Sequence, residues 1–371
     1  MFTQCAPCVR ACPPSNTPPS PQPKEKGRYQ YISMELCKHG DIESYLGRQV
    51  GKVVPALEAR SMLFQMAFSL YASKVKYALK HYDIKNLNFL LQDADVEGGD
   101  HTHVSLKYGY KGRMFDVKME RERAVVAKLA DYGTANLRPD TEQVPISMAN
   151  FTTLENTPPE FLILGEKCMQ GYGHDNWGLG LSFFHLLTGN CPYEEILEDV
   201  VCPEGLRTTL AEVWEGGGDV KLLESLINAE VYEEGDEKDF TLFDTLYRYL
   251  VLFGSWRGAG NWAVWRAVEK GLKAEKSTYK EDCGKFGLES GNNYLVSNAR
   301  ERLAEIHGGM ECLKGLLCWQ VEERWGAEQV VESAMMAELV QEVGGPEDEG
   351  DVLVNNYMHF FEEKEEAEEN N

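Results

Sequence analysis

The sequence predicts an α+β fold that is mainly helical and carries a small β-sheet. Two helical patterns support this prediction: an amphipathic one at 59–80 and one at 175–187 that is apolar almost all round. Short strand-like runs lie before and between them, at 29–36, 89–91 and 125–129. The chain has 371 residues, 43% of them hydrophobic, which is enough for one large core or two modest ones.

The order of the remaining elements follows from local signals. Gly40-Asp41 is a turn that precedes a short helix, and the runs within 92–124 indicate a β-hairpin. Gly189 is well placed to end the apolar helix. Two further helices are expected at 310–320 and 327–343.

Composition divides the chain into three parts. Residues 1–28 are rich in Pro, Ser, Cys and Lys without apolar periodicity, so we expect a disordered low-complexity segment. Residues 29–343 form the folded domain, and 344–371 form an acidic tail.

The chain is strongly acidic, with a formal net charge of -23. Such a surface repels phosphate backbones and anionic lipid, so we expect neither nucleic-acid nor membrane binding, and a basic partner fits better. No signal peptide and no membrane-spanning run is evident. The ten cysteines show no framework spacing over most of the chain, which favours a soluble protein of the cytoplasm or another reducing intracellular compartment.

One polar loop concentrates the chemistry. Asp83, Lys85 and Asn88 stand at positions i, i+2 and i+5. Phosphoryl transfer requires a carboxylate to orient the attacking hydroxyl, cations to offset charge, and oxygen ligands for Mg²⁺. Asp131, in the turn after the strand at 125–129, offers a further metal ligand. Each motif alone is also compatible with an ordinary loop or turn.

Together these motifs resemble the eukaryotic-type protein kinase family. His81–Asn88 looks like the catalytic loop H-R-D-L-x-x-x-N, and Asp131-Tyr132-Gly133 looks like D-F-G. Thr157-Pro158-Pro159-Glu160 stands where A-P-E belongs, and 175–180 resembles the D-x-W-x-x-G helix start. Arg324 matches the late arginine that pairs with the glutamate of A-P-E.

The resemblance implies a protein kinase-like fold, here mainly the helical large lobe with a small sheet near the cleft. It also implies two insertions, at about 92–124 and 194–305. Asp83 would be the catalytic base, Lys85 would contact the transferring phosphate, and Thr153 would bond the catalytic aspartate.

For the cofactors, the resemblance implies ATP and Mg²⁺. Asn88 and Asp131 would hold the metal. Met34 resembles the gatekeeper, and the hinge Glu35-Leu36-Cys37 would meet adenine through its backbone. Asp41 would reach the ribose, and Leu90 would form the floor under the base. Lys85 and Thr153 resemble the serine/threonine class of the family.

The sequence departs from the family pattern in several places. Tyr82 replaces the arginine that clamps a phosphorylated activation segment, so we do not expect phosphorylation to order this segment through an arginine–phosphate pair. Tyr132 replaces phenylalanine. No glycine-rich loop, strand lysine or helical glutamate precedes the hinge, so the N-terminal lobe is missing from this sequence. We expect a truncated kinase, and a lobe-less protein that binds partners is the alternative.

The leading hypothesis is transfer of the ATP γ-phosphate to serine or threonine of a protein substrate. A catalytically dead, pseudokinase-like scaffold is the alternative, and it would fold without binding Mg·ATP. A small-molecule kinase of the aminoglycoside or choline type also uses an aspartate–asparagine loop. Glu160 and Arg324 argue against it, because a peptide-docking segment serves no small substrate.

Overall fold

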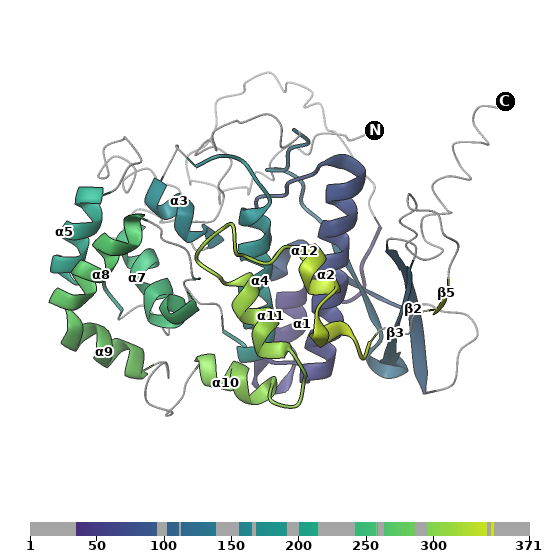
Figure 1. The fold of residues 1–371 in the computed structure, drawn as a ribbon. Coiled ribbons are helices and arrows are strands. Elements are labelled where there is room, and N and C mark those ends of the chain that lie inside the picture. The colour runs from purple at the N-terminus through teal and green to yellow at the C-terminus, as the bar shows by residue number, and fades with distance from the viewer. Residues whose placement is uncertain are drawn as a thin grey trace, which may run out of the picture.

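A computed structural model gives the fold, and it describes residues 35–94, 102–110, 113–138, 156–164, 168–190, 200–213, 242–256, 258, 263–285, 295–339 and 343–344. Figure 1 shows a central group of helices, a further set of helices on one side and a β-hairpin on the other. The predicted α+β class is confirmed, and most of the described elements are helices.

The chain enters this fold through the predicted turn. Gly40 adopts a φ of 69°, which glycine allows at little cost, and α1 (Ile42–Gly47) follows directly. Asp41 caps this helix, because its carboxylate accepts the backbone N–H of Ser44 at 2.6 Å. A short 3₁₀ helix, Val50–Lys52, leads toward the next long helix.

The first long helix, α2 (Ala56–Tyr77), begins three residues earlier and ends three residues earlier than predicted. Pro55 at its N-cap suits the start of a helix, since a proline has no backbone N–H to leave unpaired. Ala78 ends it in the left-handed conformation, and its N–H bonds back to the carbonyl of Lys74 at 2.9 Å.

Two small sheets flank α2. In one, β1 (Phe89–Asp93) pairs antiparallel with β4 (Val125–Leu129). In the other, β2 (His103–Tyr110) and β3 (Arg113–Glu120) form the predicted hairpin, and β5 (Val343–Gly344) adds to β3. A 3₁₀ helix at Arg121–Arg123 joins the hairpin to β4.

Aromatic contacts fix the hairpin to α2. The ring of Phe68 lies 5.0 Å from that of Tyr108, and the ring of Phe64 lies 5.8 Å from that of Phe115. Gln65 of α2 also accepts the N–H of Ala127 and donates to the carbonyl of Val125. The hairpin and β4 are therefore packed on one helix face.

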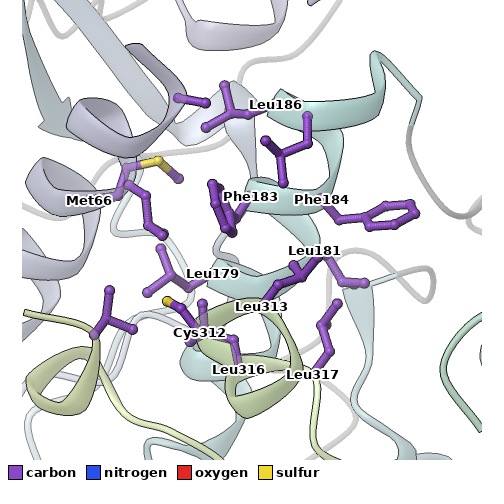
Figure 2. Packing of buried hydrophobic residues seen from close by; sticks show 14 of the residues in the cluster. Met66, Leu179, Leu181, Phe183, Phe184, Leu186, Cys312, Leu313, Leu316 and Leu317 are labelled. Carbon is purple, nitrogen blue, oxygen red and sulfur yellow. The ribbon is translucent and has the colours of Figure 1, made fainter. Parts of the chain in front are cut away.

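The apolar helix α4 (Gly173–Thr188) is the centre of the core and ends, as predicted, at Gly189 with a φ of 72°. Figure 2 shows its side chains meeting those of α2 and of α11 (Gly309–Leu316). α11 begins one residue earlier and ends four residues earlier than predicted. The labelled residues from α2 and α4 are Met66, Leu179, Leu181, Phe183, Phe184 and Leu186, and those from the α11 region are Cys312, Leu313, Leu316 and Leu317.

Several helices follow α4, within the range predicted to be the larger insertion. They are α5 (Glu204–Val213), α7 (Leu242–Phe253), α8 (Ala263–Ala274), α9 (Lys276–Lys285) and α10 (Leu295–Arg302), with a 3₁₀ turn at Gly254–Trp256. α7 packs into the main core, since the ring of Phe253 lies 5.2 Å from that of Phe184. At least part of this range is therefore integral to the fold.

The helix predicted at 327–343 is confirmed over its first five residues and is wrong beyond them. α12 spans only Ala327–Val331, and a 3₁₀ turn at Ala334–Met336 follows. The backbone N–H and the hydroxyl of Ser333 both turn back to the carbonyl of Val330, which redirects the chain. That turn buries the side chains of Met335 and Met336 completely.

Candidate active site

The loop that carries Asp83 is a compact hydrogen-bonded unit. The amide Nδ2 of Asn88 donates to the carbonyl of Asp83 at 2.7 Å and to its carboxylate at 2.8 Å. The ammonium of Lys85 lies 3.0 Å from the same carboxylate oxygen. Asp83 is 6% exposed, so these contacts act in a buried setting. The structure thus brings together three residues that the sequence singled out.

Asp175 anchors this loop by its backbone. Its carboxylate, at the start of α4, accepts the backbone N–H of His81 at 2.8 Å and that of Tyr82 at 2.7 Å. Tyr82 has a φ of 62°, an uncommon conformation for a side chain of this size. Burial raises the pKa of Asp175, and the bonds from His81 and Tyr82 act against that increase.

Sequence reasoning gave Asp175 no role beyond its place in a motif. A carboxylate in the first turn of a helix that is otherwise apolar was the available signal. A glycine is also needed here. A Cβ on Gly178 would lie 2.6 Å from the carbonyl oxygen of Ile84, so only glycine lets α4 approach the loop this closely.

Asp131 stands at the end of β4, beside the loop. The N–H of Ala130 donates to the carbonyl of Asn88 at 2.8 Å, and Nε2 of His81 donates to the carbonyl of Ala130 at 2.9 Å. These bonds set Asp131, which is exposed and has a φ of 59°, next to Asn88 along two adjoining segments. The two predicted metal ligands therefore lie on adjoining backbone segments, and their joint binding of a metal stays a prediction.

The predicted nucleotide residues line up along β1. The N–H of Leu91 donates to the carbonyl of Gly40 at 2.8 Å, and Asp41 forms a β-bridge with Leu90. Leu90 is half-buried, whereas its neighbours Phe89 and Leu91 are in the core, so Leu90 lies on the opposite face of the strand. The predicted floor residue and the predicted ribose residue are thus adjacent.

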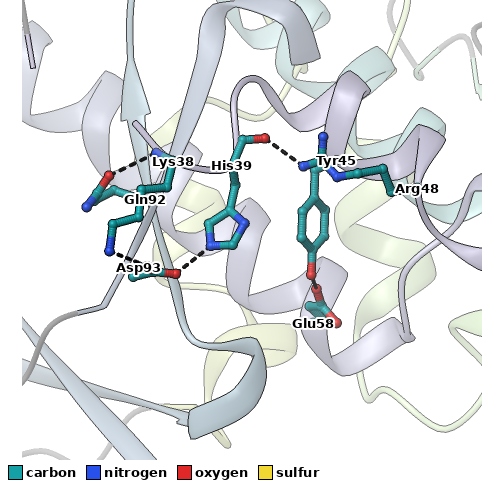
Figure 3. Close-up of polar contacts among 7 residues, drawn as sticks. All are labelled: Lys38, His39, Tyr45, Arg48, Glu58, Gln92 and Asp93. Atoms are coloured by element: carbon teal, nitrogen blue, oxygen red, sulfur yellow. Dashed lines mark hydrogen bonds and ion pairs between the residues drawn. The ribbon is translucent and has the colours of Figure 1, made fainter. Parts of the chain in front are cut away.

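Polar contacts pin the chain between the hinge and α1 (Figure 3). The ammonium of Lys38 and Nε2 of His39 both contact the carboxylate of Asp93 at the end of β1. Arg48 donates to the carbonyl of His39 at 2.7 Å. The His39 contact, followed by that of Lys38, lowers the pKa of the Asp93 carboxyl. This stretch therefore has a fixed position relative to the strand.

The remaining hinge residues lie near a lysine of β4. The carboxylate of Glu35 accepts the ammonium of Lys128 at 2.6 Å. Cys37 is half-buried, and burial raises the pKa of its thiol. The carboxylate of Asp41 bonds the backbone and the hydroxyl of Ser44, so the structure uses this residue as a helix cap. A role at the ribose stays a prediction.

The predicted pair of Glu160 and Arg324 is present and buried. Both carboxylate oxygens of Glu160, in α3 (Pro159–Leu164), accept from the two terminal nitrogens of Arg324 at 2.7 Å. The guanidinium also lies 4.9 Å from the ring centre of Trp177. This bidentate pair joins α3 to the chain that follows α11.

The protein kinase domain family matches residues 23–336, which is most of the chain. The chain belongs to this family. The resemblance drawn from the sequence motifs, and the kinase-like fold that it implied, are confirmed.

The curated relatives are distant protein kinases. Serine/threonine-protein kinase tousled-like 1-B of Danio rerio is 24% identical over 166 residues, which are 43% of this chain and 18% of that protein. Its Homo sapiens counterpart, tousled-like 1, gives the same values. Ribosomal protein S6 kinase alpha-4 of Homo sapiens is 23% identical over 200 residues, 51% of this chain and 21% of that protein. The chain spans about a fifth of the length of these relatives.

Two residues of the predicted kinase site, Thr153 and Met34, lie outside the described residues. For a metal, the described residues contain no group of three or more His, Cys, Asp or Glu side chains. The donor set at Asn88 and Asp131 is nevertheless an amide oxygen and a carboxylate, the oxygen ligands that Mg²⁺ prefers. In its contacts with Asp83, Asn88 uses its amide nitrogen, so its oxygen is not involved in them.

Proposed function

We propose that this kinase-family chain transfers the γ-phosphate of ATP to a serine or threonine hydroxyl of a protein substrate. The arrangement that carries the proposal is the buried trio of Asp83, Lys85 and Asn88, with Asp131 beside it. Such a trio orients a hydroxyl and offsets phosphate charge, which are the main demands of phosphoryl transfer.

Asp83 is the proposed base. One oxygen of its carboxylate is held by both Lys85 at 3.0 Å and Asn88 at 2.8 Å. A carboxylate held this way can accept the proton of a substrate hydroxyl without first reorganising. Lys85, 20% exposed at its side chain, is close enough to place its charge near the transferred phosphoryl group.

ATP and Mg²⁺ are the proposed cofactors. Asn88 and Asp131 would hold the metal, which when bound offsets charge on the phosphates. The backbone of Glu35 and Cys37, the carboxylate of Asp41 and the side chain of Leu90 would bind the nucleoside. The contacts of residues 39–41 with β1 support this assignment, because they keep Asp41 beside Leu90.

A serine/threonine preference rests on three supports. Lys85 stands two residues after Asp83, and Thr153 matches the threonine that bonds the catalytic aspartate in that class. The relatives named above are serine/threonine kinases by name. A basic peptide is the favoured substrate, because the chain has a net charge of -23.

The test is Asp83→Asn in the full chain. We expect kcat for phosphate transfer to fall about 10²- to 10⁴-fold, the range for loss of a general base, while Mg·ATP binding is retained. The control is Asp116→Asn, the same chemical change in β3 of the hairpin. Equal activity of Asp83→Asn and the wild type would sink the assignment. A folded wild-type protein that binds no Mg·ATP would support the scaffold alternative.

A further inference from the structure

Lys80 is a buried cation immediately before the catalytic loop. Only 1% of the residue is exposed, although a lysine is almost never fully buried without compensating contacts. Its ammonium donates to the carbonyl of Arg138 at 2.8 Å and lies 4.4 Å from the ring centre of Tyr172. The ammonium of Lys80 is therefore held between two separate stretches of chain.

These two stretches lie on either side of Glu160 in the sequence. Arg138 follows the Asp131 turn by a few residues, and Tyr172 is the residue directly before α4. A single ammonium group thus contacts the chain that leaves Asp131 and the chain that enters the central helix. Contacts with a carbonyl and with a ring face are both favourable to a buried cation.

Backbone and side-chain bonds support the same junction. Lys80 and Asn136 exchange two backbone hydrogen bonds of 2.9 Å, and the side chain of Asn136 donates to that of Gln170 at 2.9 Å. Thr134 donates its hydroxyl to the carbonyl of His81 at 2.8 Å. The chain after Asp131 is therefore fastened to both the catalytic loop and the approach to α4.

We propose that Lys80 is a positioning residue whose ammonium clamps the chain after Asp131 to Tyr172, and so sets the start of the segment on which a protein substrate docks. The substrate part of this inference rests on the proposed function. The clamp itself does not, since it can be measured in the absence of substrate.

The first test is amide hydrogen exchange over residues 134–138 in full-length Lys80→Met. Loss of a charged hydrogen bond should speed exchange of the Asn136 amide by about 10-fold or more. Lys80→Arg keeps the charge and should restore slow exchange. Lys76→Met changes an exposed lysine of α2 and is the matched control. Exchange in Lys80→Met equal to that in Lys76→Met would overturn the clamp.

The second test separates docking from chemistry. For Lys80→Met we expect KM for a basic peptide to rise by about 10-fold with kcat and KM for Mg·ATP nearly unchanged, because Asp175 still holds the catalytic loop. A fall in kcat without a change in peptide KM would contradict the docking role. Faster exchange in a protein without kinase activity would leave the clamp standing and refute the proposed function instead.

If Lys80→Met does not fold, Tyr172 offers a second route to the same answer. Tyr172→Phe keeps a ring face for the ammonium, whereas Tyr172→Leu removes it. We expect Tyr172→Leu to speed exchange at 134–138 and Tyr172→Phe to behave like the wild type. Equal exchange in the two variants would show that the ring plays no part in the clamp.

Discussion

At the scale of single residues, Arg324 makes more contacts than the predicted ion pair. Besides Glu160, it donates to the carbonyls of Cys318, Gly173 and Trp319 at 2.8, 2.9 and 3.2 Å. A guanidinium can do this because its planar fork presents several donors at once. The buried guanidinium of Arg324 therefore makes these three bonds to carbonyls in addition to its two bonds to Glu160, which explains how its charge tolerates burial.

The first prediction concerns this pair. Arg324→Ala leaves the Glu160 carboxylate buried without its cation, so we expect the free energy of unfolding to fall by about 3–5 kcal/mol. The control is Arg123→Ala, which breaks the more exposed Arg123–Glu58 contact of 3.3 Å and should cost about 1 kcal/mol or less. Urea unfolding of both variants measures the difference. Similar losses in the two variants would contradict the assignment.

Two buried histidines lead to a prediction about pH. Burial lowers the pKa of His174 to about 3 and that of His185 to about 4. Both lie below the value of about 6.5 expected in the unfolded chain, so the unfolded state binds these protons first as pH falls. Stability is thus full above pH 6.5 and is lost as pH falls toward 4.

Each of these histidines should remove about 1.4 kcal/mol of stability per pH unit below about 6.5. His185→Gln should reduce the slope of unfolding free energy against pH between 6.5 and 5, and His307→Gln, which changes an exposed histidine, is the control. Urea unfolding at each pH gives the slopes. An unchanged slope in His185→Gln would show that His185 is not protected from protonation in the fold.

At the scale of elements, the contact between α4 and the catalytic loop decides the geometry of the site. α4 contributes Asp175 from its first turn and a close approach at Gly178, and the two features act on neighbouring parts of the loop. The helix is buried along nearly its whole length, so it cannot shift to relieve a clash. Loop and helix therefore behave as one rigid unit.

The element-scale prediction is that Gly178→Ala damages both stability and activity. The new Cβ would meet Ile84 at 2.6 Å, so the loop must move, and overpacking of this kind costs about 1–3 kcal/mol. Gly47→Ala, at the end of α1 with nothing within 4 Å, is the control and should be neutral. Unfolding free energy and kcat are measured for both. A Gly178→Ala variant with normal kcat would refute the rigid coupling.

At the scale of the whole molecule, charge is the dominant property. A net charge of -23 on 371 residues creates a field that attracts cationic partners over distances beyond direct contact. No helix in the described part of the chain is long and apolar enough to span a membrane.

We predict that kcat/KM for a basic peptide falls several-fold as NaCl rises from about 0.05 to 0.5 M, because screening shortens the reach of the field. A neutral peptide carrying the same acceptor serine is the control and should change less. Steady-state kinetics at a series of salt concentrations measures both. Equal salt dependence of the two peptides would contradict a preference for basic substrates.

Much of the fold and of the candidate site could be predicted from the sequence, because these features depend on local chemistry. The turn at Gly40-Asp41, the hairpin within 92–124 and the apolar helix ending at Gly189 were each predicted from neighbouring residues, and each is present. So is the pairing of Glu160 with Arg324, which the family motifs implied. The helix expected at 327–343 failed, because burial of Met335 and Met336 outweighed local helical periodicity.

The sequence by itself determined the family, the order of the motifs and the identity of the residues in the catalytic loop. Only the tertiary structure decided how these residues are held. Asp175 and Lys80 are distant in sequence from what they fix, and no local pattern reports a buried charge paired with a remote backbone. The reason is physical: burial removes water as a partner, so a charged group must find its partners wherever the fold brings them.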